Sequence, residues 1–378
     1  MCNTRFVVMA SFLLVLGFSS LSSASAKVSS LAFQHDAGSS GRRSEPQRPL
    51  KPPFPNGPCG GTIVAIPPED TFGIDAKLAG NPVLLPPRAL YVWLPSDYHQ
   101  SNDQDNDEQE QKRYPVLYCH DGQNAMEDSS SWTGASWRLA GALTRLKQRK
   151  MISQIPIVVM LPSAEGDFVP GVRRRHLEYG DMNNVFAQAH VDFVVETVKP
   201  LIDATFRTLV EPHHTFAIGS SLGGQASFHM LLRHPDVFGG VACMSPAFQP
   251  ATLAAVVSDS NQQQELSLSN NHDYGATWWK DKRIYLDMGG DLNEEKVQWF
   301  DMMDHLTPKH WWNPGYFWLD TQLKPSLQAM LLALQLKKIP HSYTTFPGAR
   351  HNERAWSQRI DRPLMHLFGP SDNAVTDN

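Results

Sequence analysis

Two adjacent serines, Ser220 and Ser221, stand among three glycines in the stretch IGSSLGGQASF. Glycines fall two positions before and two positions after Ser221, which is the G-x-S-x-G spacing of a sharp strand-to-helix turn. Such glycines let the strand and helix backbones approach each other, and the turn pushes the central side chain outward. The spacing therefore selects Ser221, and not its neighbour Ser220, as the candidate nucleophile.

A serine hydroxyl attacks a carbonyl carbon only when a base accepts its proton and donors stabilise the oxyanion. After a nucleophile turn of this kind, the other two members of a catalytic triad follow along the chain, first the acid and then the histidine. His351 lies in a glycine-containing loop after the last predicted strand, whereas His341 opens that strand. We predict His351 as the base. The N–H of Leu222, at the start of the following helix, is the predicted first oxyanion donor.

The acid should follow the strand RIYLDM, where three carboxylates compete. Asp287 lies within the strand, and Glu294 lies far enough on to begin the next helix. Asp291 comes directly after two glycines and is best placed to reach a histidine. We predict Asp291 as the acid, with Glu294 as the alternative.

A second oxyanion donor should come from the loop after an earlier strand, in the stretch VLYCHDGQN. Gly122 allows the backbone to turn there, and the N–H of Gln123 is the candidate donor. The alternative is a simple turn at the end of a strand. Asp121 is expected to cap or brace this loop.

Short apolar runs alternate with longer amphipathic segments along the chain. The predicted strands are 89–95, 115–119, 155–162, 215–219, 240–245, 283–288 and 341–346. The predicted helices are 135–148, 187–203, 222–233, 322–337 and 353–366. Strands that are apolar throughout and separated by helices indicate an α/β domain, with a mostly parallel central sheet and helices on both faces. The early strands can pair antiparallel at one edge.

The first 26 residues combine one arginine, an apolar stretch and a small-residue end, which is typical of a secretory signal peptide. An uncleaved anchor is the alternative. Residues 27–60 are rich in Ser, Pro and Gly and predict a flexible leader. A single domain is expected over 61–369 and a disordered tail over 370–378. Cleavage would remove Arg5 and no acid, so the net charge of −5 would become −5 − 1 = −6.

Composition and cysteine usage exclude several classes of protein. The chain has 378 residues, of which 41% are hydrophobic, and its net charge of −5 includes no basic block longer than 173–175. Nucleic acid is therefore not an expected partner. Cleavage would leave Cys59, Cys119 and Cys243, an odd number without close spacing, so neither a disulfide framework nor a zinc site is expected.

Several stretches together carry a resemblance to a known family: RYPVLYCHDGQN, GSSLGGQASFHMLLRHPDVFGGVACMSPAF and GARHNERAW. They resemble the esterase D-like branch of the α/β-hydrolases, which includes enterochelin, feruloyl and acetylxylan esterases, from about residue 72 to residue 369. The resemblance implies the α/β-hydrolase fold, with Ser221 as nucleophile and His351 as base. Family members usually carry an acid three residues after a glycine at the strand exit. Leu292 stands three after Gly289, so the pattern is shifted here.

A complete triad would hydrolyse an ester through an acyl-serine intermediate without a metal or organic cofactor. Together with the predicted signal peptide, this chemistry predicts a secreted carboxylesterase acting on an extracellular ester, such as a feruloyl or acetyl ester of cell-wall polysaccharide. A siderophore-ester hydrolase and a catalytically inactive carbohydrate-binding protein are the alternatives. The aromatic stretch 299–318 either lines a substrate cleft or packs against the core. Its cleft candidates are Trp311, Trp312, Tyr316 and Trp318.

Overall fold

The computed structural model describes residues 58–71, 75–78, 81–86, 88–99, 112–131, 133–258, 279–290 and 319–370. The chain divides into two units, Met1–Arg48 and Pro49–Asn378, and every described residue belongs to the second. The signal peptide and nearly all of the leader and tail lie outside the described residues. Those three segments therefore stay predictions.

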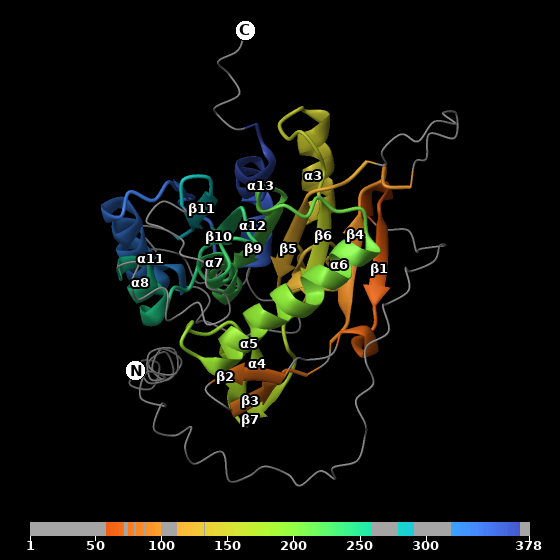
Figure 1. Ribbon diagram of the computed structural model, residues 1–378. Helices are drawn as coiled ribbons and strands as arrows, with labels where there is room; N and C mark the ends of the chain where they lie inside the picture. The colour runs from red at the N-terminus through yellow and green to blue at the C-terminus, as the bar shows by residue number, and fades with distance from the viewer. Residues whose placement is uncertain are drawn as a thin grey trace, which may run out of the picture. The chain divides into compact units, whose positions relative to one another are not determined.

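The centre of the second unit is an eight-stranded mixed sheet (Figure 1). In spatial order its strands are β1 (Thr62–Ile66), β4 (Leu90–Leu94), β6 (Ile157–Leu161), β5 (Val116–His120), β9 (Thr215–Ser220), β10 (Gly240–Met244), β11 (Arg283–Met288) and β12 (Ser342–Thr345). The six strands from β6 to β12 are parallel, whereas β4 pairs antiparallel with both β1 and β6. The predicted parallel sheet with antiparallel pairing at one edge is confirmed.

The central strands are buried on both faces, which explains why their sequences are apolar without alternation. Every residue of β5, β6 and β10 is buried. Successive side chains enter two separate cores: Val116 and Tyr118 face one, and Leu117 and Cys119 face the other.

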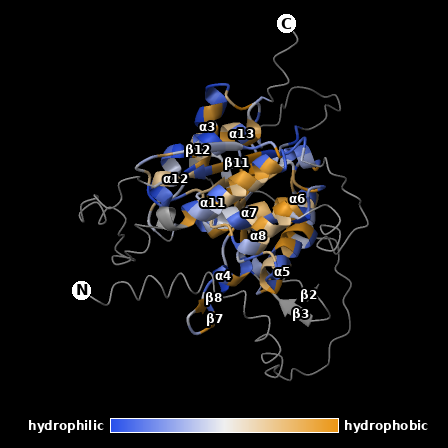
Figure 2. Cartoon of the chain, turned by 90° about the vertical axis from the view of Figure 1, so that its left-hand side faces the viewer, coloured by the Kyte–Doolittle hydropathy of each residue, from blue (hydrophilic) through white to orange (hydrophobic). Residues whose placement is uncertain are grey.

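Helices cover both faces of the sheet. One face packs against α5 (Val185–Phe193), α6 (Lys199–Thr205), α7 (Leu222–Arg233), α8 (Pro250–Val257) and α11 (Leu319–Leu336). The other packs against α3 (Leu139–Gln148), α12 (Glu353–Arg359) and α13 (Asp361–Phe368). Figure 2 shows hydrophilic and hydrophobic residues side by side along α3 and α11, as expected for helices with one buried face. None of the described helices is long and apolar enough to cross a membrane.

The carboxyl ends of the parallel strands share one edge of the sheet, where ligand sites form in folds of this class. After β6, the chain forms a hairpin of β7 (Asp167–Val169) and β8 (Val172–Arg173), and then α4 (Arg174–Glu178). A second small hairpin joins β2 (Asp75–Leu78) to β3 (Asn81–Leu84).

The helices predicted over 135–148, 187–203 and 353–366 differ from those observed. The helix predicted over 135–148 begins only at Leu139, because Arg138 adopts a left-handed conformation with φ 55°. The N–H groups of Trp137 and Leu139 instead donate to the carbonyls of Asn124 and Ala125, at 2.8 and 3.0 Å. This segment therefore bonds to the loop after β5 before the helix starts.

The helix predicted over 353–366 is two helices, α12 and α13, which meet at Ile360. Pro363 lies in the first turn of α13 and has no N–H to donate to the carbonyl of Arg359. A continuous helix would leave that carbonyl without its usual partner. The segment predicted over 187–203 is helical from Val185 to Thr205, with a π-helical turn at Val194–Val198 between α5 and α6.

Candidate active site

Ser221 occupies the turn between β9 and α7 with φ 56° and ψ −125°. This conformation is strained for a residue with a side chain, and such strain is concentrated at functional turns. Both main-chain groups of Ser221 are held by the end of β10 and the segment that follows it. Its N–H donates to the carbonyl of Met244 at 2.9 Å, and its carbonyl accepts from the N–H of Ala247 at 3.0 Å. The strained turn is therefore fixed by the neighbouring strand.

The two glycines of the motif are required by close contacts. A Cβ at Gly219 would lie 2.2 Å from the carbonyl oxygen of Gly223, so the start of the helix packs directly on the end of the strand. A Cβ at Gly223 would lie 3.0 Å from Oδ2 of Asp121 and 3.2 Å from Cβ of His120. The loop after β5 is thus in contact with the first turn after Ser221.

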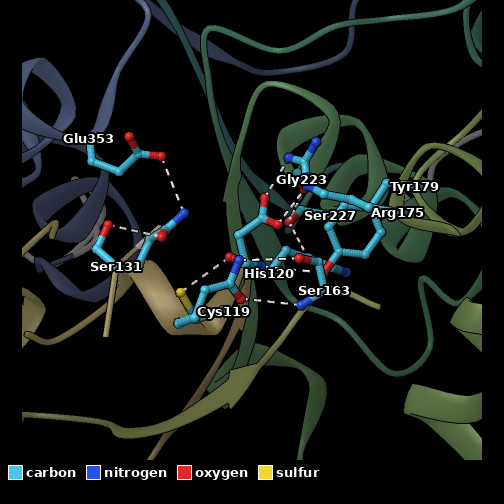
Figure 3. Close-up of polar contacts among 12 residues, drawn as sticks. Cys119, His120, Ser131, Ser163, Arg175, Tyr179, Gly223, Ser227 and Glu353 are labelled. Atoms are coloured by element: carbon cyan, nitrogen blue, oxygen red, sulfur yellow. Dashed lines mark hydrogen bonds and ion pairs between the residues drawn. The ribbon is translucent and has the colours of Figure 1, made fainter. Parts of the chain in front are cut away.

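Asp121 braces this loop, as the sequence predicted. Its carboxylate accepts two hydrogen bonds from Arg175 of α4, from Nε at 2.7 Å and from Nη2 at 2.6 Å (Figure 3). Its own N–H donates to the hydroxyl of Tyr179 at 3.3 Å. Asp121 has a left-handed backbone conformation with φ 51°, which turns the chain sharply into the 3₁₀ turn Gly122–Asn124.

Gln123, in the middle of that turn, is held through its side chain and its carbonyl. Its Nε2 donates to Ser163 Oγ at 3.1 Å, and the N–H of Ser163 donates to its Oε1 at 3.2 Å. Ser130 Oγ donates to its carbonyl at 2.8 Å. These bonds hold both the side chain and the carbonyl of the residue whose N–H is the predicted oxyanion donor. The donor role itself remains a prediction.

His351 lies in the turn between β12 and α12 and is 2% exposed. The ring of Trp356 packs edge-on against its imidazole with 5.0 Å between ring centroids. The turn is bound to the exit of β11, because Phe346 N–H donates to the carbonyl of Met288 at 2.8 Å and Gly290 N–H donates to that of Ala349 at 2.7 Å. The turn that contains His351 is therefore fixed by β12, which it follows, and by the end of β11.

One hydrogen bond links the loop after β5 to the helix after His351. Asn124 Nδ2 donates to Glu353 Oε1 at 3.2 Å, and the dashed line to Glu353 marks it in Figure 3. The two loops come from β5 and β12, which lie on opposite sides of β9 in the sheet order. The bond therefore connects two segments that come from opposite sides of β9, the strand that ends at the turn of Ser221. Ser221, Gln123 and His351 are gathered at one edge of the sheet.

The acid and cleft candidates cannot be placed relative to these residues. Asp291, Glu294 and the four aromatic cleft candidates (Trp311, Trp312, Tyr316 and Trp318) lie outside the described residues. The identity of the acid stays open between Asp291 and Glu294. Asp287, which is described, is completely buried and forms an ion pair with Arg359 at 3.1 Å.

A cluster of buried histidines lies behind the loop after β5. His120 Nδ1 is 2.8 Å from Ser227 Oγ, and its Nε2 is 3.1 Å from Nε2 of His190. Burial lowers the pKa of His120 to about 4 and lowers those of His190 and His229 well below their usual value. These rings are therefore neutral at pH 7, and those of His120 and His190 are hydrogen-bonded within the core.

Long-range partners were the part of the site that the sequence did not reveal. Arg175 and Ser163 brace the loop after β5, yet they lie 54 and 40 residues from the partners they hold. No spacing rule connects residues so far apart. Among the described residues, no group of three or more His, Cys, Asp or Glu side chains is placed to hold a metal ion.

The sheet, its helices and a strained serine turn at the carboxyl edge define an α/β-hydrolase. The model of the Esterase family, described as "Putative esterase", matches residues 85–367. The chain belongs to this family and is a carboxylic ester hydrolase. No curated protein sequence matches it.

Solved structures of several esterases are similar to this chain at low sequence identity. One ferulic acid esterase matches with a TM-score of 0.52 and 15% identity, over 82% of this chain and 98% of that chain. The enterobactin esterase FES from Shigella flexneri matches with a TM-score of 0.46 and 16% identity, over 85% of this chain and 63% of that chain. The siderophore hydrolase EstB from Aspergillus nidulans matches with a TM-score of 0.48 and 17% identity, over 74% and 89%.

Proposed function

We propose that the protein is a secreted serine carboxylesterase that cleaves an extracellular acyl ester through an acyl-enzyme on Ser221. The observation that carries this proposal is the strained conformation of Ser221 between β9 and α7, two residues before Gly223, which lies close to Asp121 at the start of the loop of Gln123. A turn of this kind presents a hydroxyl at the edge of the sheet, next to N–H groups that the helix start leaves without intrahelical partners.

In the proposed reaction, Ser221 Oγ attacks the ester carbonyl carbon while His351 accepts the hydroxyl proton. The carbonyl oxygen becomes an oxyanion, which accepts hydrogen bonds from the N–H groups of Leu222 and Gln123. The C–O bond to the alcohol then breaks, and His351 returns the proton to the departing oxygen. Water, activated by the same histidine, releases the acid and restores the serine. Asp291, or else Glu294, orients the imidazole.

For the substrate, we infer an acyl ester of cell-wall polysaccharide, with feruloyl and acetyl groups as the first candidates. Two features support this class. The first 26 residues have the composition of a secretory signal peptide, which would direct the enzyme to extracellular esters. One structural neighbour, with a TM-score of 0.52, is a ferulic acid esterase, and 98% of its length is covered.

The test compares two adjacent serines. We expect Ser221→Ala to abolish hydrolysis of a short chromogenic acyl ester and labelling by a fluorophosphonate. Ser220→Ala should keep both, because Ser220 lies buried at the end of β9 and its hydroxyl takes no part in the reaction. Far-ultraviolet circular dichroism and thermal melting check that each variant is folded.

Two results would overturn the proposal. A folded wild type that neither turns over any acyl ester nor reacts with a fluorophosphonate would be a binding protein with the hydrolase fold. Full activity of Ser221→Ala would place the nucleophile elsewhere. Feruloylated and acetylated glycans, tested beside a siderophore ester, then separate the substrate classes by kcat/KM.

A further inference from the structure

A completely buried ion pair joins the end of α12 to the end of β11. Arg359 Nη2 lies 3.1 Å from Asp287 Oδ1, and the two side chains are 2% and 0% exposed. Buried pairs of this kind contribute little net stability, because removing both charges from water costs about as much as their attraction returns. Asp287 and Arg359 are also too far apart in the sequence for the pair to stabilise a single helix or turn. Its effect on geometry is therefore the property to consider.

The same pair fixes the segment after β10. Asp287 Oδ1 accepts from the N–H of Ser245 at 3.0 Å, and Arg359 Nη2 donates to Ser245 Oγ at 2.8 Å. Ser245 has an unusual backbone conformation, with φ 42°. Without these partners, a serine would not hold a conformation of this kind at low energy. Asp287 and Arg359 together set the path of the chain at Ser245.

That segment is the one that holds the candidate nucleophile. Met244, just before Ser245, accepts the hydrogen bond from Ser221 N–H, and Ala247, two residues after Ser245, donates to the carbonyl of Ser221. Any shift of the chain at Ser245 therefore moves the backbone of Ser221.

At its other end, the pair holds the candidate base. Arg359 ends α12, the helix that begins two residues after His351, and its guanidinium lies 5.0 Å from the ring centroid of Phe346. Phe346 stands at the start of the turn that carries His351, so Arg359, on the helix after that turn, contacts the segment before it. The Asn124–Glu353 hydrogen bond holds the same helix at its first residue.

We propose that Asp287 and Arg359 are positioning residues for acyl transfer: they fix the turn of His351 and the turn of Ser221 against one another. The inference rests on the proposed function and adds two residues to it. Neither side chain touches the substrate. Because proton transfer needs its two atoms within hydrogen-bond reach, a displacement of about 1 Å between the turns lowers kcat by about 100-fold.

The test separates positioning from stability through a double variant. Arg359→Met alone leaves the buried Asp287 carboxylate without its charged partner and should lower the midpoint of urea unfolding. Asp287→Asn combined with Arg359→Met removes both charges and should recover most of that midpoint. Positioning predicts that kcat of this double variant stays about 10- to 100-fold below wild type, with KM for a small acyl ester nearly unchanged.

A matched control uses the ion pair of the next helix. Arg145 of α3 pairs with Asp361 of α13, and this pair is partly exposed and has no bond to the turns of Ser221 or His351. The double variant Arg145→Met with Asp361→Asn should keep kcat near wild type. A folded Asp287→Asn/Arg359→Met protein with wild-type kcat would overturn the positioning role, whatever its unfolding midpoint.

Arg359→Lys decides the question if the double variant does not fold. Lysine keeps the charge that Asp287 needs, but its shorter reach and single nitrogen do not reproduce the planar contact with Asp287, Ser245 and Phe346. We expect a folded protein with kcat between those of wild type and Arg359→Met. Wild-type kcat for Arg359→Lys would overturn the proposal. A wild type without esterase turnover or fluorophosphonate labelling would instead remove the proposed function, and this inference with it.

Discussion

The guanidinium of Arg175 grips the carboxylate of Asp121 through two hydrogen bonds, at 2.7 and 2.6 Å, one residue before the turn that carries Gln123. Arg175→Gln would leave the Asp121 carboxylate, whose side chain is 3% exposed, without its charged partner. We expect the loop to shift and kcat for ester hydrolysis to fall by about tenfold or more, with a smaller change in KM. Steady-state kinetics on a chromogenic ester measures both.

The control for that change lies on the same connection after β5. Arg138 pairs with Asp128 at 2.7 Å, but the two side chains are 70% and 44% exposed. An exposed pair contributes little, so Arg138→Gln should keep wild-type kcat. Equal activities of Arg175→Gln and Arg138→Gln would contradict the bracing role of Arg175.

Ser163 should affect catalysis through Gln123 alone. Ser163→Ala removes the hydroxyl that accepts from Gln123 Nε2 and keeps the N–H that donates to its Oε1. With one of two side-chain bonds lost, the proposed oxyanion donor is held less firmly. We expect a loss of a few-fold in kcat. Gln123→Ala, which loses both bonds, should lose more, and the reverse order would argue against this role.

The glycines near Ser221 should differ sharply in their tolerance of a methyl group. At Gly219 a Cβ would meet the carbonyl oxygen of Gly223 at 2.2 Å, whereas at Gly224 its nearest neighbour would be the carbonyl oxygen of Gly219 at 3.2 Å. Backbone atoms cannot move away as a flexible side chain can. Gly219→Ala should therefore lower the free energy of unfolding by about 3 kcal/mol or more, and Gly224→Ala by less. Urea unfolding of both variants gives the comparison.

Stability should fall in mild acid because of the buried histidines. The pKa of His120 is lowered by burial to about 4, below its ordinary value of about 6.5. Below pH 6.5 the imidazole of His120 is protonated in the unfolded chain, whereas in the folded protein it stays neutral down to about pH 4. His120 alone therefore removes about 3 kcal/mol of unfolding free energy between pH 7 and pH 4, and His190 and His229 act in the same direction.

His120→Asn isolates this contribution. The variant loses hydrogen bonds to Ser227 and His190, so it should be less stable than wild type at pH 8. Its deficit should shrink as the pH falls, because it lacks the titrating ring. Unfolding free energies measured by urea between pH 8 and pH 4.5 test this. Parallel curves for the two proteins would rule out the titration of His120 as a cause.

The sequence predicted the elements that depend on local order along the chain. The apolar runs gave the central strands, and G-x-S-x-G gave the turn at Ser221, because both depend on neighbouring residues. The prediction of one helix over 353–366 is wrong, although Pro363 indicates the break between α12 and α13. The prediction of a helical Arg138 is also wrong, and local sequence could not correct it, because the left-handed conformation of Arg138 depends on bonds from its neighbours to the loop after β5.

Tertiary structure decided how the turns are held relative to one another. The partners of Asp121, Gln123 and Asp287 lie dozens of residues away, and their contacts arise only when the strands take their order in the sheet. The sequence around a carboxylate does not indicate which distant arginine will pair with it. The amino-acid sequence by itself thus determined the fold class and the candidate nucleophile and base, through periodicity and turn chemistry. The packing of distant elements, which brings buried charges into contact, decided the framework that places them.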